Sequence, residues 1–357
     1  MSIATTLEEK IKKLSISLLL GLSGCIASHY QLDPNYKCPK PLDPVGIGYY
    51  DHTYREPLNL VLEKILDDNE DYTLRHFTFL ENHSESGLAC VNYYGVKGEG
   101  KKPLVLLSPI LISKSPELNP ECELFAEYFA QNGISAAIIG RLEDGVEKGI
   151  TESRISIRES IFHLYVEDSL RKSILHIRRV VDFLEKRPEV DLYKIGSFGI
   201  SMGGIKNCIT ASIDPRLRVN IFCITAENIP SILVSTTEDS IEKSIKQLQE
   251  KYGLSIEDIE KKMRSVSLSD PMHYANSIDA RNTLFVMARW DTVAPTELQE
   301  SLRERIGYPE TIVLNSGHYT SALYAFLPWP FNYMQRKSLD FFKRKFGELD
   351  RDLTAKN

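Results

Sequence analysis

The chain has 357 residues, of which 42% are hydrophobic and 26% are charged, as is ordinary for a globular protein. Its formal net charge is −6, and no block of lysine and arginine stands out, which argues against a nucleic-acid partner. A chain of this length can bury a large core within one α/β domain that carries an insertion.

The first 25 residues follow the order of segments that is typical of a secretory signal peptide. Three lysines between positions 10 and 13 precede a short apolar run, and small residues then lead to Cys25. The run is too short to span a bilayer, which needs about 20 apolar residues. The junction is similar to a bacterial lipobox, whose cysteine is acylated and becomes the mature N-terminus. We therefore expect a signal peptide over 1–24 and an exported lipoprotein anchored to a membrane of the cell envelope through Cys25. An amphipathic start with an incidental cysteine is the alternative.

Residues 25–57 are predicted to form a tether and an N-terminal extension, and the folded body is expected to occupy 58–357. Four prolines lie among polar residues between positions 34 and 44, and this composition favours an extended chain. The pattern then predicts a short helix around 58–66 as the start of the folded body.

From about position 72 the pattern becomes that of an α/β protein. Two strands, 72–80 and 88–95, are expected to form a hairpin because a polar turn joins them. Short apolar runs then alternate with amphipathic segments, which predicts a mostly parallel central sheet with helices on both faces. The further predicted strands are 104–107, 134–139, 194–199, 217–224, 283–288 and 311–314, and the predicted helices are 121–132, 159–187, 203–213, 296–306 and 335–346.

One charged segment, 229–270, interrupts the alternation of strands and helices. Thr236 with Asp239 and Ser255 with Asp258 are spaced like capping pairs, each at the start of a helix. Two short helices between two core strands would form a small cap insertion over the carboxyl edge of the sheet. A solvated insertion with no part in substrate choice is the alternative.

The strongest chemical signal is the sequence GISMG at 199–203, centred on Ser201 and placed directly after a predicted strand. It matches the G-x-S-x-G pattern of a strand-to-helix turn that lifts a nucleophilic serine above the sheet. The glycines two positions away from Ser201 leave room for the strand and the helix to approach each other. A glycine-rich turn without a catalytic role is the alternative.

A serine hydroxyl is a poor nucleophile unless a neighbouring base takes its proton. Of the eight histidines, His318 lies on a loop between the last predicted strand and the last predicted helix, at the edge that should also carry Ser201. We predict that His318 is the general base. The other seven lie in the tether, the hairpin, the long helix or after the cap: His29, His52, His76, His83, His163, His176 and His273.

Asp291 is predicted to hydrogen-bond His318 and to stabilise its charged form. It follows the buried strand 283–288, so it also belongs at the carboxyl edge. The order serine, acid, histidine along the chain is that of the α/β-hydrolase triad. A turn or capping role for Asp291 is the alternative, and Glu227 is the second choice for the acid.

Two backbone N–H groups are expected to hold the negative charge that develops on a substrate carbonyl. One is that of Met202, directly after the nucleophile. The other should come from the loop after strand 104–107, where Pro109 has no N–H to give. Ile110 is therefore the predicted second donor, with Leu111 behind it.

The cysteines after position 25 number five, and none is spaced for a zinc site. Cys208 and Cys223 fall in segments that are predicted to be buried, where a free cysteine acts as a small hydrophobic residue. A disulfide between Cys38 and Cys122 would suit an exported protein, but the sequence leaves it open. No metal and no organic cofactor is implied.

With these residues in place, the chain resembles the α/β-hydrolase superfamily from about residue 72 to 347. Within it, the pattern is most similar to dienelactone-hydrolase-like and acetyl-xylan-esterase-like members. The residues that carry the likeness are 184–190, 195–204, 290–295 and 317–319.

The resemblance implies a serine hydrolase with Ser201 as nucleophile, His318 as base and Asp291 as acid. We expect it to cleave a small-molecule carboxylic ester through an acyl-enzyme. The substrate does not follow from the resemblance, because this fold hosts many chemistries. The alternatives are a thioesterase or peptidase with the same triad, and a non-catalytic surface lipoprotein that binds a ligand. The oligomeric state does not follow from the sequence.

Overall fold

The computed structural model describes residues 27–41, 48–50, 59–80, 88–109, 120–141, 158–326 and 332–354. The predicted signal peptide, Cys25 and Ile110 lie outside these residues. None of the helices in the described part of the chain is long and apolar enough to cross a membrane.

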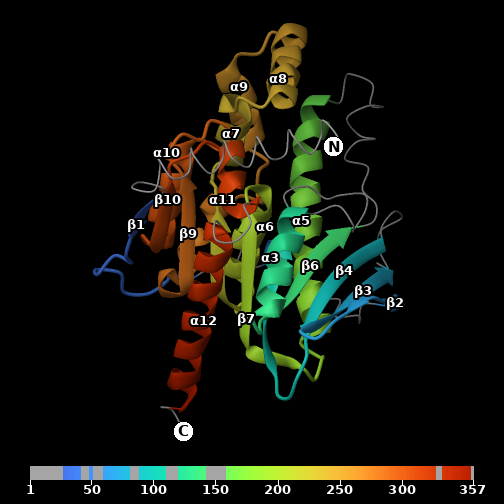
Figure 1. Cartoon of the computed structure of the whole chain (residues 1–357). Coiled ribbons are helices and arrows are strands. Elements are labelled where there is room, and N and C mark those ends of the chain that lie inside the picture. Colours follow the sequence, from blue (N-terminus) through green and yellow to red (C-terminus); the bar gives the residue numbers. More distant parts are fainter. Residues whose placement is uncertain are drawn as a thin grey trace, which may run out of the picture.

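Ten strands form one sheet with helices on both faces (Figure 1). In chain order the strands are β1 (Ala27–Tyr30), β2 (Asn59–Asp68), β3 (Tyr72–Leu80), β4 (Leu88–Val96), β5 (Lys102–Ser108), β6 (Ser135–Arg141), β7 (Val190–Ile200), β8 (Leu217–Cys223), β9 (Thr283–Ala288) and β10 (Glu310–Leu314). The helices are α3 (Pro120–Gln131), α5 (Arg158–Leu184), α6 (Met202–Ile213), α7 (Ile229–Ser235), α8 (Asp239–Tyr252), α9 (Ile256–Arg264), α10 (Thr296–Ile306), α11 (Ala322–Phe326) and α12 (Tyr333–Thr354). Short 3-10 turns are η1 (Pro271–His273), η2 (Ala275–Ser277), η3 (Ala280–Asn282) and η4 (Tyr319–Ser321).

The strand order across the sheet is β1-β10-β9-β8-β7-β5-β6-β4-β3-β2. The central strands from β6 to β10 are parallel, whereas β1 at one edge and the strands from β4 to β2 at the other are antiparallel. After β5 the chain builds β6 on one side and then crosses to β7 on the other. Ligands of open α/β sheets bind outside the carboxyl ends of the strands at such a reversal, so the ends of β5 and β7 are the expected place for a site.

The central strands are buried on both faces, which explains why their sequences are continuous apolar runs. In β5, Val105 and Leu107 pack in the cluster that holds α3 and α12, while Leu104 and Leu106 pack in the cluster that holds α5. Helices α6 and α10 cover the same face as α5 further along the sheet. The predicted parallel sheet with helices on both faces is confirmed.

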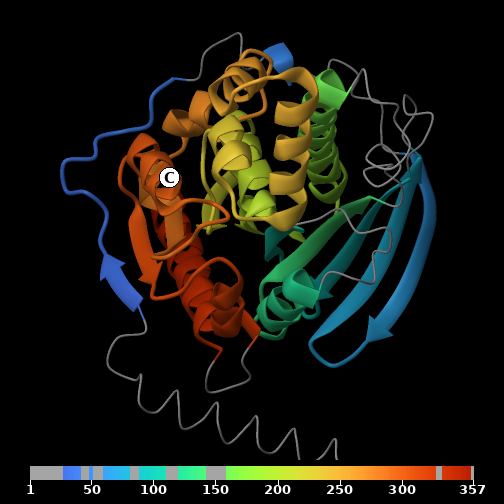
Figure 2. The same cartoon turned by 90° about the horizontal axis from the view of Figure 1, so that it is seen from above.

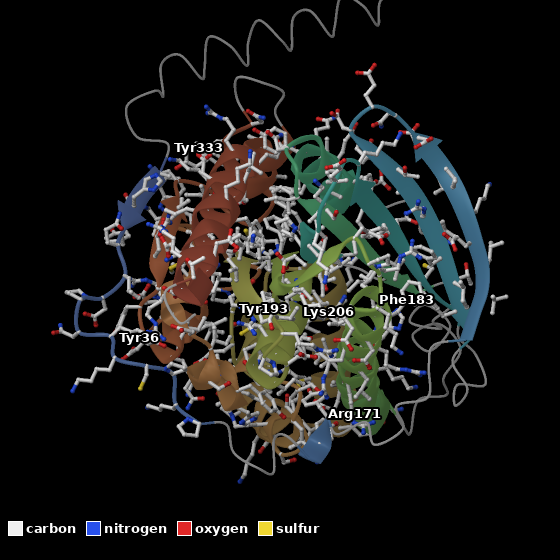
Figure 3. All side chains as sticks on the ribbon, turned by 90° about the horizontal axis from the view of Figure 1, so that it is seen from below. Tyr36, Arg171, Phe183, Tyr193, Lys206 and Tyr333 are labelled. Carbon is white, nitrogen blue, oxygen red and sulfur yellow. The ribbon has the colours of Figure 1, made fainter. Side chains whose placement is uncertain are left out.

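Residues 59–68 form strand β2, so the predicted helix around 58–66 is wrong. The five large apolar residues of β2 follow a helix-like spacing, but each is between 42% and 60% exposed. Figure 3 shows β2 at the outer edge of the sheet. Its conformation comes from antiparallel pairing with β3, and such tertiary pairing overrides a local propensity.

The predicted tether is also wrong in part, because residues 27–30 form β1 and pair with β10. The following residues run along the outside of the body (Figure 2). Tyr36 fastens them, since its hydroxyl accepts a hydrogen bond from Ala280 N at 3.1 Å. Cys38 is exposed and Cys122 is buried, and both are free, so the open question of a disulfide is answered against it.

The cap segment, residues 229–270, contains three helices rather than two, and Figure 2 looks down onto them. Helix α9 begins with a capping box of Ser255 and Asp258, as predicted. Helix α8 instead has Glu238 as its N-cap residue, so the predicted pair of Thr236 and Asp239 is wrong.

Both ends of the cap segment meet at one buried carboxylate. Asp270 accepts hydrogen bonds from Asn228 N at 2.9 Å and from Ile229 N at 2.6 Å. Burial raises the pKa of Asp270 despite these donors. The chain therefore leaves the body and returns to it at the same point.

Candidate active site

Ser201 lies at a sharp turn between β7 and α6, at the reversal point of the sheet. Its φ of 53° and ψ of −121° are unusual for a residue with a side chain, and such strain is typical of functional sites. The turn is fixed by hydrogen bonds from Ser201 N to Cys223 O at 2.8 Å and from Ile205 N to Ser201 O at 3.0 Å.

The glycines around Ser201 are required by close backbone contacts. A Cβ at Gly199 would lie 2.5 Å from Gly203 C, and one at Gly203 would lie 2.1 Å from Ser108 O. A Cβ at Gly204 would lie 1.8 Å from Thr225 Oγ1. Any side chain at these positions would push α6 away from the sheet and move Ser201.

The three side chains singled out from the sequence form one chain of hydrogen bonds. Ser201 Oγ lies 3.1 Å from His318 Nε2, and His318 Nδ1 lies 2.8 Å from Asp291 Oδ2. The His318 side chain is 10% exposed and that of Asp291 is fully buried. With this arrangement the imidazole can accept the serine proton while the carboxylate stabilises its positive charge.

The Asp291 carboxylate accepts four hydrogen bonds. Oδ1 accepts from Val293 N and Ala294 N, both at 2.9 Å. Oδ2 accepts from Gln299 Nε2 at 3.0 Å in addition to His318. These donors hold the carboxylate in one orientation, so the imidazole is held as well.

Gln299 was missed by the sequence reasoning. It is fully buried in α10, and its Nε2 also donates to Ala294 O at 2.7 Å while its Oε1 accepts from Ala288 N at 3.2 Å. Its place in the sequence, eight positions after Asp291 on the following helix, matches no known motif.

The loops that carry Asp291 and His318 are joined through their backbones. Arg289 N donates to Leu314 O and Trp290 N donates to Ser316 O, both at 3.0 Å. These bonds extend the pairing of β9 and β10 beyond the strand ends. A Cβ at Gly317 would lie 3.1 Å from Trp290 O, so the residue before the histidine is small where the loops touch.

The alternative acid and bases lie in other environments. Glu227 accepts hydrogen bonds from Arg305 and from Ser301, so its carboxylate is already paired with these two side chains. His76 pairs with Asn92 and Thr78 in the hairpin, and His273 contacts Ser267 O. The structure therefore brings only His318 and Asp291, among these described candidates, to hydrogen-bonding distance of each other and of Ser201.

Met202, the first predicted oxyanion donor, is the first residue of α6. The second, Ile110, directly follows the described part of its loop. That loop is anchored at Ser108, whose Oγ donates to Asn207 Oδ1 at 2.6 Å, and at Pro109, whose carbonyl accepts from Lys206 Nζ at 3.0 Å.

Lys206 is a second residue that sequence reasoning missed. It is buried on α6, and Figure 3 labels it near the middle of the body. Burial lowers the pKa of its ammonium group to about 8. A buried lysine that donates to Pro109 O links the helix of the serine to the loop expected to carry the second oxyanion donor.

The cap segment touches both loops of the site. Tyr319, the residue after His318, donates a hydrogen bond from its hydroxyl to Glu238, which raises the pKa of Tyr319. Thr237 N donates to Thr292 O at 3.2 Å, next to Asp291. The cap is therefore fastened to the residues that neighbour His318 and Asp291.

A cavity of about 550 Å³ opens beside Ser201 and His318. Its walls come from the cap, from the carboxyl ends of β7 to β10 and from α3 and α12. This volume lies in the range of about 300–1,000 Å³ that is usual for small-molecule sites.

Solved structures with a similar fold include two acetyl xylan esterases. The one from Paenibacillus sp. R4 superposes with a TM-score of 0.63 at 18% identity, covering 87% of this chain and 97% of that chain. Acetyl xylan esterase 1 from Thermoanaerobacterium sp. JW/SL YS485 gives a TM-score of 0.62 at 15% identity, covering 87% and 99%. The chain has the α/β-hydrolase fold.

A third solved structure, a 2,6-dihydroxy-pseudo-oxynicotine hydrolase, shares this fold with a TM-score of 0.50 at 16% identity, covering 75% of this chain and 67% of that chain. No protein-family model matches the sequence, and no curated protein sequence matches it. At these identities the α/β-hydrolase likeness establishes the fold alone.

Proposed function

We propose that this protein is a serine hydrolase that cleaves carboxylic esters through an acyl-enzyme on Ser201. One observation carries the proposal: the unbroken hydrogen-bond chain from Ser201 through His318 to the buried Asp291. The strained turn at Ser201 and the apolar cavity beside it support it, as does the esterase activity named for two proteins of the same fold.

In the first step, His318 takes the Ser201 proton as the oxygen attacks the ester carbonyl. The N–H groups of Met202 and Ile110 hold the oxyanion, and His318 then gives its proton to the leaving alcohol. In the second step, His318 removes a proton from water, which attacks the acyl carbon. The bond from that carbon to Ser201 Oγ then breaks, His318 returns its proton to Ser201 Oγ, and the acid is released. Asp291 stays ionised and stabilises the imidazolium in both steps.

The test combines active-site labelling with turnover. A fluorophosphonate probe should label the protein, and short p-nitrophenyl esters should be hydrolysed. The Ser201→Ala variant should do neither, since loss of the nucleophile in a comparable triad lowers kcat about a millionfold. Equal turnover by the variant and the unmodified protein would place the chemistry elsewhere and overturn the proposal.

We also propose that the protein is exported and anchored through a lipid on Cys25. The order of basic, apolar and small residues before Cys25 supports this. The anchored enzyme would meet its substrate at a membrane surface of the cell envelope.

A further inference from the structure

The cavity beside Ser201 has two apolar walls on opposite sides of the sheet edge. Phe125, Phe198, Leu314 and Met334 form part of one wall and belong to the core cluster under α3 and α12. These side chains come from a helix, two strands and a second helix. The cavity therefore reaches from the serine into the hydrophobic core on that face.

The second wall comes mainly from the cap. Ile229, Ile232 and Leu233 of α7 line it together with Ile241 of α8. Leu233 and Ile241 also pack against the apolar cluster inside the cap, and Ile229 is buried in the cluster beneath it, so these side chains join the cavity to the apolar packing of the cap. The cap is therefore a hydrophobic part of the binding site and not only a solvated insertion.

The Asp, Glu, Lys and Arg side chains in the described lining of the cavity are all acidic. The described residues that line the cavity include the carboxylates Glu121 and Glu238 but neither lysine nor arginine. Among these described residues, a substrate that carries a carboxylate or a phosphate would find no counter-ion. Polar side chains such as Thr236 and Ser321 are outnumbered by apolar ones in the described lining, so a sugar would find fewer hydrogen-bond partners there than an acyl chain finds apolar contacts. A neutral, apolar group fits this environment.

The size of the cavity suits a chain longer than an acetyl group. If each CH2 takes about the 30 Å³ that a water molecule occupies in the liquid, an eight-carbon chain needs about 240 Å³. The cavity offers about 550 Å³. An acetyl group would leave most of this apolar space unused.

We propose that the substrate is a neutral ester with a linear acyl chain of about eight carbons or more, held against the cap wall and the core wall. This rests on the proposed ester hydrolysis at Ser201. The product is a carboxylate, which is disfavoured in an apolar cavity beside Glu238. The same lining that binds the neutral ester thereby favours release of the acid.

The test is a series of p-nitrophenyl esters from acetate to decanoate, hydrolysed by the full-length protein below the critical micelle concentration of each ester. Each buried CH2 should raise kcat/KM about fourfold. Octanoate should therefore exceed acetate by about a thousandfold or more. Per-acetylated xylose, offered as a polar acetyl ester, should be hydrolysed at least a hundredfold less efficiently than octanoate.

Ile232→Trp narrows the cavity from the cap side and should shift the optimum to shorter chains. If the indole ring excludes two CH2 groups of the acyl chain from the cavity, the ratio of kcat/KM for octanoate to that for acetate should fall about sixteenfold. The matched control is Ile256→Trp on α9, where Ile256 is 41% exposed and does not line the cavity. This control should leave the ratio unchanged.

The outcomes separate the two proposals. Fluorophosphonate labelling with kcat/KM that is highest for acetate and falls with chain length would overturn the acyl-chain inference and leave ester hydrolysis standing. An Ile232→Trp variant that labels normally and keeps the octanoate-to-acetate ratio would also overturn the inference. Absence of labelling and of turnover for every ester would overturn both.

Discussion

Replacing Gln299 by glutamate would put a second carboxyl group beside Asp291 with almost no change of shape. The new oxygen would take the place of Gln299 Nε2, 3.0 Å from Asp291 Oδ2. Two unit charges at that separation repel by about 5 kcal/mol at an effective dielectric constant of about 20. The pKa of the introduced carboxyl should therefore rise from about 4 to about 8.

Between these two pH values the folded variant holds a proton that the unfolded chain has released. Folding stability relative to the unmodified protein should therefore fall by about 1.4 kcal/mol for each pH unit from about 4 to about 8. Urea unfolding at pH 5, 6, 7 and 8, followed by circular dichroism, measures this difference. Gln31→Glu, in the exposed segment after β1, makes the same change of charge away from Asp291 and should show no such slope. A pH-independent difference for Gln299→Glu would refute the placement of Gln299 against Asp291.

Three other outcomes follow from the described contacts and the sequence. Asp291→Asn should keep the fold but lower kcat about 10⁴-fold, because the amide favours the wrong tautomer of His318; a loss below tenfold in ester hydrolysis would contradict the role of Asp291. Lys206→Met removes a buried ammonium group whose pKa is about 8 in the folded protein and 10.5 when unperturbed. The unfolded chain holds this proton more tightly than the folded protein does. The free energy of unfolding of the unmodified protein should therefore rise by about 3 kcal/mol relative to the variant between pH 8 and pH 10.5, as measured by urea unfolding. If the free energy of unfolding of both proteins depends on pH in the same way, the pKa of Lys206 is not lowered by burial. Cys25→Ser should move the protein from the membrane fraction to the soluble fraction, and unchanged fractionation would reject lipidation.

The central sheet could be predicted because strands that are buried on both faces are continuous apolar runs in the sequence. Strand β9 and helix α10 were predicted with the bounds that the structure has. Strand β2 could not be predicted from the sequence, because its apolar residues are exposed and its conformation depends on hydrogen bonds to β3. An exposed edge strand carries no alternation between buried and exposed positions that a sequence pattern could detect.

The meeting of Ser201, Asp291 and His318 could be expected because each follows a strand of one parallel sheet. The supporting roles of Gln299 and Lys206 could not be predicted from the sequence. Gln299 acts through a contact between a helix and the turn before it, and Lys206 acts across 97 positions of the chain. Neither contact leaves a spacing or a motif in the sequence, so both emerge only when the elements are packed together.

The meeting of both cap ends at Asp270 has a consequence for how this scaffold can change. Asn228 and Ile229, which open the cap, share a carboxylate with the residue that closes it. Helices α7, α8 and α9 lie between these two points. Their removal or exchange would leave the points where the chain leaves and rejoins the body side by side. Since these helices form one wall of the cavity beside Ser201, the proposed chain-length preference can diverge by replacing them, while the strands and loops that hold Ser201, Asp291 and His318 stay as they are.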